Sequence, residues 1–65
     1  MKEHDCVEFI RPVQAEGLSI PVGTHGVLVS PEYPDGGFLV ELGDEFDHEC
    51  PGVHKDNLKV TWVCP

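Results

Sequence analysis

Positive charge is scarce in this 65-residue sequence, which has four lysine and arginine residues against twelve aspartate and glutamate residues. The four cations are Lys2, Arg11, Lys55 and Lys59, and they are scattered along the chain rather than gathered in one stripe. Proteins that bind nucleic acid use Lys and Arg to neutralise phosphates and release counterions. The formal net charge of −8 therefore argues against a nucleic acid partner. Acidity on this scale either keeps the protein soluble or attracts a basic protein partner, and both interpretations stay open.

Long apolar runs are also missing. No segment approaches the roughly 20 apolar residues that a membrane-spanning helix needs, and the polar start of the chain lacks the apolar core of a secretory signal. These features predict a cytoplasmic protein with no membrane partner. The length predicts a single domain, residues 1–65, with a thin core. So short a chain leaves little room for an enclosed catalytic pocket, so we expect neither an enzyme nor a cofactor.

Windows long enough for a helix are absent, because seven glycines and six prolines interrupt the chain throughout. The acidic stretch at residues 41–50 lacks the apolar stripe of a helix. Short runs rich in Val, Ile, Leu and Phe remain between the breakers, and such runs at short spacing are typical of a small barrel or sandwich. The sequence therefore predicts an all-β fold. The five expected strands are residues 5–10, 24–30, 38–42, 46–50 and 59–63.

Three connections complete the expected order of elements. Residues 14–23 form a long first loop that folds back over one end of the core. Residues 31–37 form a turn that makes a hairpin of the second and third strands, because its prolines preset φ and its Asp-Gly-Gly step accepts positive φ. Residues 53–58 form a single short 3₁₀ turn before the last strand.

The segment Gly23-Thr24-His25-Gly26-Val27 resembles the Gly-x-x-Gly-x-Val turn of SH3-like barrels, including KOW-type modules and small bacterial proteins. A Glu16-Gly17-Leu18 step precedes that turn, as in those families, and residues 56–60 resemble their closing turn into the last strand. The resemblance implies a five-stranded SH3-like barrel in which the first strand pairs with the fifth. It also implies a KOW-like, RNA- or ribosome-associated module as an alternative function, although the basic loops of the RNA-binding members are missing here.

Two tripeptides share a His-x-Cys pattern, His4-Asp5-Cys6 and His48-Glu49-Cys50. Residues two apart in a strand point to the same face, so each pair could present two soft ligands, and the four together would suit tetrahedral zinc. If the first strand instead lies beside the last, Cys6 approaches Cys64, and the two could form a disulfide or part of a site with His4. Neither spacing matches an established zinc motif, and cytosolic cysteines are mostly plain thiols. For these reasons no bound metal is expected. The two His-x-Cys pairs still leave a metal- or redox-responsive domain as an alternative function.

The densest charge feature is the acidic stretch between residues 41 and 49. It lacks the spacing and central glycine of a calcium loop. Charges that protect a strand edge are one interpretation. The other is a docking surface for a basic protein, with Phe46 as an apolar anchor inside an acidic ring. The residues expected to bind that partner are Glu41, Asp44, Glu45, Phe46, Asp47 and Glu49.

The leading functional hypothesis is a non-enzymatic interaction module whose acidic face binds a positively charged protein. An antitoxin, an immunity-type inhibitor and a regulatory accessory subunit all fit this description. Homodimerisation through an exposed barrel edge is a further possibility for so small a core, and the sequence does not decide it.

Overall fold

The fold is described by a computed structural model covering residues 1–63 and 65. Its regular elements are short strands and two 3₁₀ helices, and the described residues contain no α-helix, which confirms the all-β class. The elements are β1 (Cys6–Phe9), β2 (Val13–Ala15), β3 (Leu18–Ile20), β4 (His25–Leu28), β5 (Gly37–Leu42), η1 (Asp44–Phe46), β6 (Gly52–His54), η2 (Lys55–Asn57) and β7 (Leu58–Trp62). Within the described part of the chain, no helix is long and apolar enough to cross a membrane.

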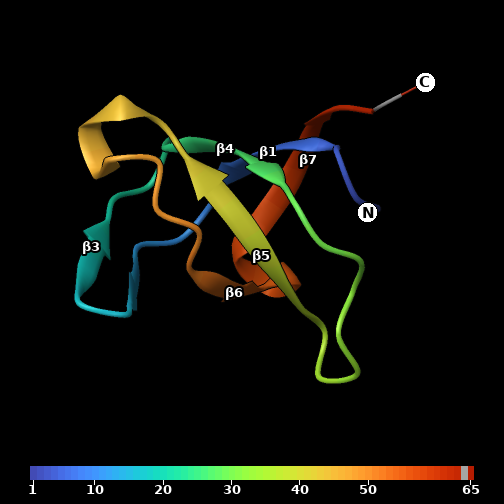
Figure 1. The fold of residues 1–65 in the computed structure, drawn as a ribbon, viewed down its shortest axis with the longest axis horizontal. Coiled ribbons are helices and arrows are strands. Elements are labelled where there is room, and N and C mark those ends of the chain that lie inside the picture. The colour runs from blue at the N-terminus through green and yellow to red at the C-terminus, as the bar shows by residue number, and fades with distance from the viewer. Residues whose placement is uncertain (64) are drawn as a thin grey trace.

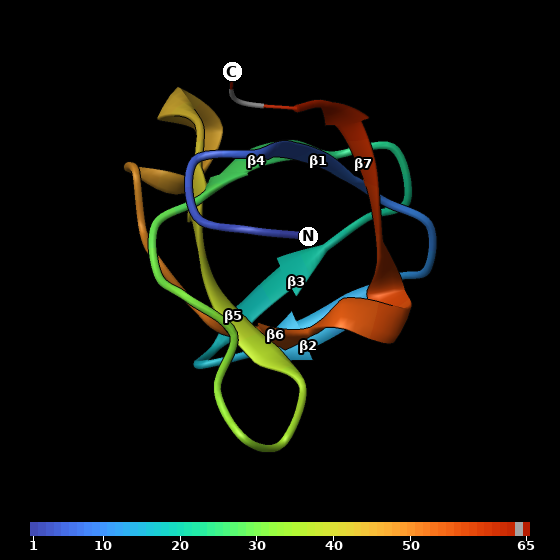
Figure 2. The same cartoon turned by 90° about the vertical axis from the view of Figure 1, so that its right-hand side faces the viewer.

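Five of the strands form one antiparallel sheet in the order β6-β5-β4-β1-β7. The sheet curls into a half-barrel, with the small β2–β3 hairpin across one open side (Figures 1 and 2). β1 lies between β4 and β7, so the first strand pairs with the last, as the resemblance implied. β4, β5 and β6 follow one another as a meander.

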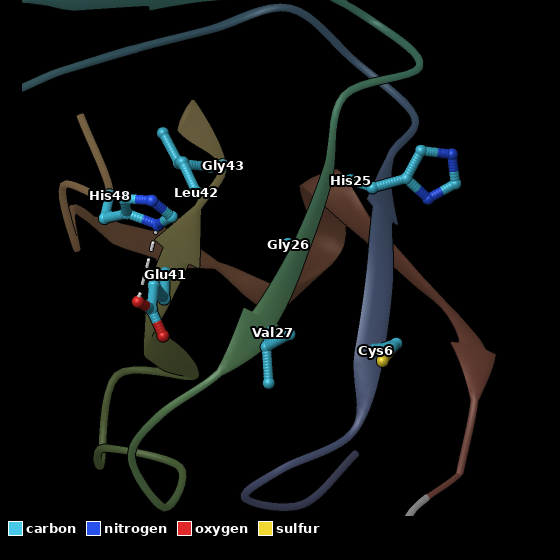
Figure 3. A pocket seen from close by; sticks show the side chains of 8 residues that line it. All are labelled: Cys6, His25, Gly26, Val27, Glu41, Leu42, Gly43 and His48. Atoms are coloured by element: carbon cyan, nitrogen blue, oxygen red, sulfur yellow. Dashed lines mark ion pairs between the residues drawn. The ribbon is translucent and has the colours of Figure 1, made fainter. Parts of the chain in front are cut away.

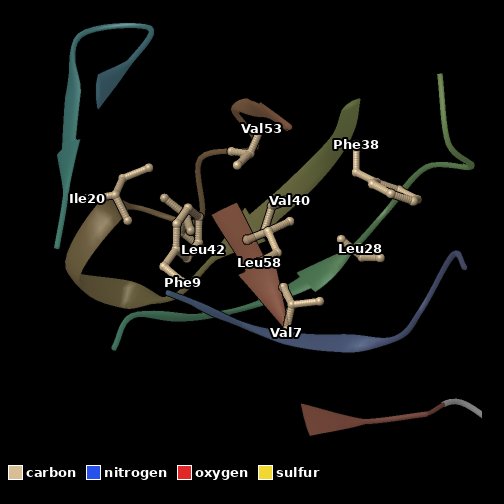
Figure 4. Packing of buried hydrophobic residues seen from close by; sticks show 9 residues of the cluster. All are labelled: Val7, Phe9, Ile20, Leu28, Phe38, Val40, Leu42, Val53 and Leu58. Carbon is tan, nitrogen blue, oxygen red and sulfur yellow. The ribbon is translucent and has the colours of Figure 1, made fainter. Parts of the chain in front are cut away.

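The core lies inside the curl of the sheet (Figure 4). Because successive side chains in a strand point to opposite faces, alternate residues of β1 and β5 enter the core and the residues between them face outward. Each fully buried aliphatic or aromatic side chain contributes about 1.5–3 kcal/mol of transfer free energy. The buried apolar residues are Val7, Phe9, Ile20, Leu28, Phe38, Val40, Leu42, Val53 and Leu58.

The expected first loop is a β-hairpin. Glu16 and Gly17 have φ angles of 51° and 81° and join β2 to β3 as a two-residue turn. Positive φ at both central residues is the requirement of the type I′ turn that matches the twist of a hairpin. Ile20 is only 1% exposed, so the hairpin closes one end of the core, as expected of this segment. The side chain of Glu16 also accepts a hydrogen bond from the Gly52 N–H (2.9 Å), which links the hairpin to β6.

The expected strand at residues 46–50 is wrong, and the fourth strand of the meander is β6 at Gly52–His54. Asp47 and His48 both have positive φ, 55° and 56°, and two left-handed residues in succession turn the chain rather than extend it. Pro51 then follows, and proline cannot donate to a strand ladder. The expected 3₁₀ turn at residues 53–58 is also shorter, because only Lys55–Asn57 forms η2. The other four expected strands are confirmed to within two residues at each end.

The two glycines of the Gly-x-x-Gly turn serve different purposes. Gly23 has a φ of 91°, a left-handed conformation that favours glycine. Gly26 lies where β4 passes close to β5. A Cβ atom there would lie 2.6 Å from Cγ1 of Val40 and 2.9 Å from the carbonyl oxygen of Glu41. Gly23 thus bends the chain, and Gly26 lets the two strands approach each other.

Candidate functional site

The acidic segment, defined here as residues 41–49, leaves the sheet at the end of β5, forms η1 and returns towards β6. It projects from one corner of the molecule (Figure 1, top left). The side chain of Asp44 is 94% exposed and that of Glu41 is 45% exposed. The remaining acidic residues of the segment are exposed as well, namely Glu45, Asp47 and Glu49.

Backbone hydrogen bonds hold the acidic segment against β5. The N–H groups of Phe46 and His48 both donate to the carbonyl oxygen of Gly43 (3.0 and 3.2 Å), and the N–H of Glu49 donates to Phe46 (3.1 Å). The N–H of Leu42 on β5 donates to the carbonyl oxygen of Glu49 (2.9 Å), which closes the turn. The carboxylates of the segment therefore stand on a hydrogen-bonded turn rather than on a loose loop.

Phe46 lies differently from the exposed anchor expected from the sequence. Its side chain is half-buried and packs against the hydrophobic core. Phe46 therefore fixes the acidic segment to the core of the half-barrel and presents less apolar surface than an exposed aromatic side chain would.

His48 lies among the carboxylates of the acidic segment. Its Nδ1 is 3.8 Å from Oε2 of Glu41, and its Nε2 contacts Oδ1 of Asp44. These contacts become ion pairs when the imidazole is protonated. The acidic segment contains no lysine or arginine. When His48 is neutral, no positive charge within the segment offsets its carboxylates.

The lysines of the molecule pair with carboxylates elsewhere. Lys2 contacts Asp5 (2.9 Å), Lys55 contacts Glu32 (2.9 Å) and Lys59 lies 3.8 Å from Glu8. The hydrogen bond from Lys55 to the Glu32 carboxylate raises the pKa of Lys55 above its ordinary value. None of these pairs includes a carboxylate of the acidic segment, so the negative field there is not offset by these lysines.

A hollow of about 460 Å³ lies beside the acidic segment, on the outer face of the sheet. We call it the outer groove. In Figure 3 the side chain of Val27 lies between His48 and Glu41 on one side and Cys6 and His25 on the other. The residues that line the outer groove are Cys6, His25, Gly26, Val27, Glu41, Leu42, Gly43 and His48.

The strand register explains how the outer groove forms. Cys6 on β1 is paired with Val27 on β4, and Val27 is paired with Glu41 on β5. On its other side Cys6 is paired with Trp62, whose exposure is 54%. The side chains of Cys6, Val27 and Glu41 therefore lie in one row across the outer face and line the groove, with the carboxylate at the β5 end. Sequence reasoning singled out neither His25 nor Val27 as site residues, because only the pairing of distant strands places them beside the acidic segment.

The two His-x-Cys pairs do not come together as a ligand set. His4 lies before β1 in a left-handed conformation (φ 78°), so it does not share the strand geometry of Cys6. Cys6 and His48 line opposite sides of the outer groove, whereas His4 and Cys50 are not among its lining residues. Residues 1–63 and 65 include no group of three or more His, Cys, Asp or Glu side chains arranged to hold a metal ion. The expected pairing of Cys6 with Cys64 lies outside the described residues.

No family model, curated protein or solved structure that was compared with the chain matches it. A function therefore has to follow from the chemistry of its own surface. The two features that stand out on this surface are adjacent, since Glu41 and His48 belong both to the acidic segment and to the outer groove.

Proposed function

We propose that this chain is a non-enzymatic interaction module of the SH3-like barrel type whose acidic segment binds a basic protein partner. The observation that carries this proposal is the set of carboxylates presented together on one hydrogen-bonded turn without a lysine or arginine among them. An antitoxin, an immunity-type inhibitor and an accessory subunit would each use such a surface.

The order of elements supports the SH3-like part of the proposal. β1 lies beside β7, β4 to β6 form a meander, and η2 immediately precedes the last strand. This is the arrangement that the resemblance of the Gly23–Gly26 turn implies.

The electrostatic argument follows from the position of the charges. Carboxylates gathered on a projecting turn create a negative potential that attracts a positively charged surface and accelerates encounter. The attraction between exposed charges is screened by salt, with a Debye length of about 8 Å at physiological ionic strength. Binding of the partner should therefore weaken as salt concentration rises.

A pull-down from nuclease-treated host lysate tests the proposal. It uses the wild type and two variants of equal net charge as bait. The first variant, Asp44→Asn with Glu45→Gln and Asp47→Asn, removes three charges from the acidic segment. The control, Glu3→Gln with Glu32→Gln and Asp56→Asn, removes three exposed charges outside it. We expect the wild type and the control to retain the same basic protein and the first variant to lose it. Equal retention by all three proteins would contradict the proposal.

The alternative functions gain less support. The KOW-like RNA-associated function rests on the fold resemblance alone, and a shared fold does not carry a shared function. The metal- or redox-responsive function would need the ligands of the two His-x-Cys pairs on one site, and the described residues do not bring them together.

A further inference from the structure

The outer groove is large enough for a side chain of a partner. Its volume of about 460 Å³ lies within the range of roughly 300–1,000 Å³ that is typical of pockets for small ligands. Val27 provides an apolar, half-buried surface in its middle, and Leu42 and Gly43 also line it. Since an apolar surface gains most from an apolar contact, the groove favours an aliphatic or aromatic group.

The charge around the outer groove is of one sign. Glu41 lines the groove, Asp44 is linked to it through His48, and no lysine or arginine is among the lining residues. A purely apolar ligand would make no use of these exposed carboxylates, whose negative charge attracts a cation. The matching ligand therefore carries an apolar group next to a positive charge.

We infer that the outer groove seats one aliphatic or aromatic side chain of the basic partner, while a neighbouring lysine or arginine of that partner pairs with Glu41 and Asp44. The inference rests on the proposed function and deepens it, because it names the chemistry of the contact segment. In this arrangement the apolar anchor comes from the partner and enters over Val27. Phe46, which packs against the core, holds the acidic segment in place.

Two fluorescein-labelled peptides test the inference on the full 65-residue chain by fluorescence anisotropy. The first has the sequence Gly-Ser-Lys-Lys-Leu-Lys-Lys-Ser-Gly, and the second has serine in place of leucine, so the two carry the same charge. We expect the wild type to bind the leucine peptide about five- to tenfold more tightly than the serine peptide, less than full burial of an aliphatic side chain would give, because a surface groove buries the side chain only in part.

Three variants separate the apolar contact from the charge contact. Val27→Thr keeps the shape and strand preference of the residue but makes the groove polar, and we expect it to abolish most of the preference for leucine. Glu41→Gln with Asp44→Asn should weaken binding of both peptides and leave the preference unchanged. Asp56→Asn removes a charge from η2, beyond the other end of β5, and should leave the affinity for both peptides unchanged.

The outcomes separate the inference about the outer groove from the proposed function of the acidic segment. Equal affinity of the wild type for both peptides, with weaker binding by the Glu41 and Asp44 variant, would overturn the groove inference and leave the acidic segment as the binding surface. Unchanged binding by that charge variant would overturn the proposed function. Failure of the leucine peptide to bind saturably at millimolar concentration would overturn both.

A second measurement guards against misfolding of the Val27→Thr variant. In ¹H–¹⁵N spectra of the wild type, the leucine peptide should shift the backbone amides of Val27, Leu42 and Gly43 more than the serine peptide does. Amide shifts confined to other parts of the barrel would show that the leucine side chain does not enter the outer groove.

Discussion

Single residues determine how closely the strands of this curled sheet approach each other. Gly26 is the clearest case, because the space for a side chain is already filled by Val40 and by the backbone of Glu41. The close approach of β4 and β5 positions Val27 and Glu41 side by side on the outer face. Packing at Gly26 on one face of the sheet therefore helps to define the outer groove on the other face.

Replacing Gly26 with alanine should destabilise the fold by about 1–3 kcal/mol, the usual cost of overpacking a core. Its Cβ atom would lie 2.9 Å from the carbonyl oxygen of Glu41, so the backbone itself would have to move. Urea unfolding of the purified protein measures the effect. Gly52→Ala is the matched control, since a Cβ atom at Gly52 meets nothing within 4 Å. Equal stability of the two variants would show that the close approach is not required.

At the scale of elements, the β2–β3 hairpin is held to the half-barrel by packing and by one polar link. Ile20 buries its side chain in the core, and Glu16 reaches across the gap to the N–H of Gly52 on β6. The link joins segments 36 residues apart in the sequence. The hairpin therefore depends on a specific side chain at its turn as well as on hydrophobic burial.

Replacing Glu16 with alanine should leave the fold intact and speed hydrogen exchange of the Gly52 amide, because that N–H loses its acceptor. The loss in stability should be about 0.5–1.5 kcal/mol, the net value of a typical hydrogen bond. Glu16→Gln keeps an acceptor oxygen and should retain the slower exchange. Equally slow exchange of Gly52 in the wild type and in the alanine variant would mean that the link is not formed in solution.

The turn before β5 and η2 are joined by the ion pair of Glu32 with Lys55. The pKa of Lys55 is raised above 10.5 by this partner, so the stabilisation is present below that pH and is lost as pH rises through the folded pKa. Because the pair is exposed, the contribution is small. Glu32→Gln should lower the melting temperature slightly at pH 8, and the difference from wild type should shrink as pH rises through the folded pKa of Lys55. A difference that persists unchanged at high pH would contradict this account.

The elements also show which parts of the fold could be predicted from the sequence. Alternation of apolar residues was long enough in β1 and β5 to reveal both strands, whereas the strands of the β2–β3 hairpin have only three residues each. Glu16-Gly17 is also a weaker hairpin signal than Asn-Gly or Asp-Gly. Residues 46–50 were expected to form a strand, but the left-handed backbone at Asp47 and His48 breaks it. Asp and His adopt this conformation more often than most residues, yet that preference is too weak to predict the turn from the sequence.

The candidate site was predicted only in part, for a different reason. The acidic segment is continuous in the sequence, so its residues could be named without a structure. The outer groove combines residues of β1, β4 and β5, and its formation depends on the register between strands that are distant in the sequence. A shift of one residue in that register would turn Val27 towards the core, and the alternation pattern of one strand does not specify its partner's register.

At the scale of the whole molecule, net charge and its distribution carry different information. The formal charge of −8 follows from the composition and fits either solubility or partner binding. The structure adds that the lysines pair with carboxylates outside the acidic segment, and that this segment borders an apolar groove. Under the proposed function, this distribution would draw a basic surface to one corner of the molecule, whereas an evenly spread charge would not.

The most direct test of this claim is the salt dependence of binding to the basic protein recovered from the host lysate, measured for the wild type and for the variant with Asp44→Asn, Glu45→Gln and Asp47→Asn. We predict that the affinity of the wild type falls by about tenfold or more between 50 and 300 mM salt, because the attracting charges are exposed and screened. The variant should bind weakly at both concentrations. Affinity that is indifferent to salt and equal in the two proteins would contradict the acidic segment as the binding surface.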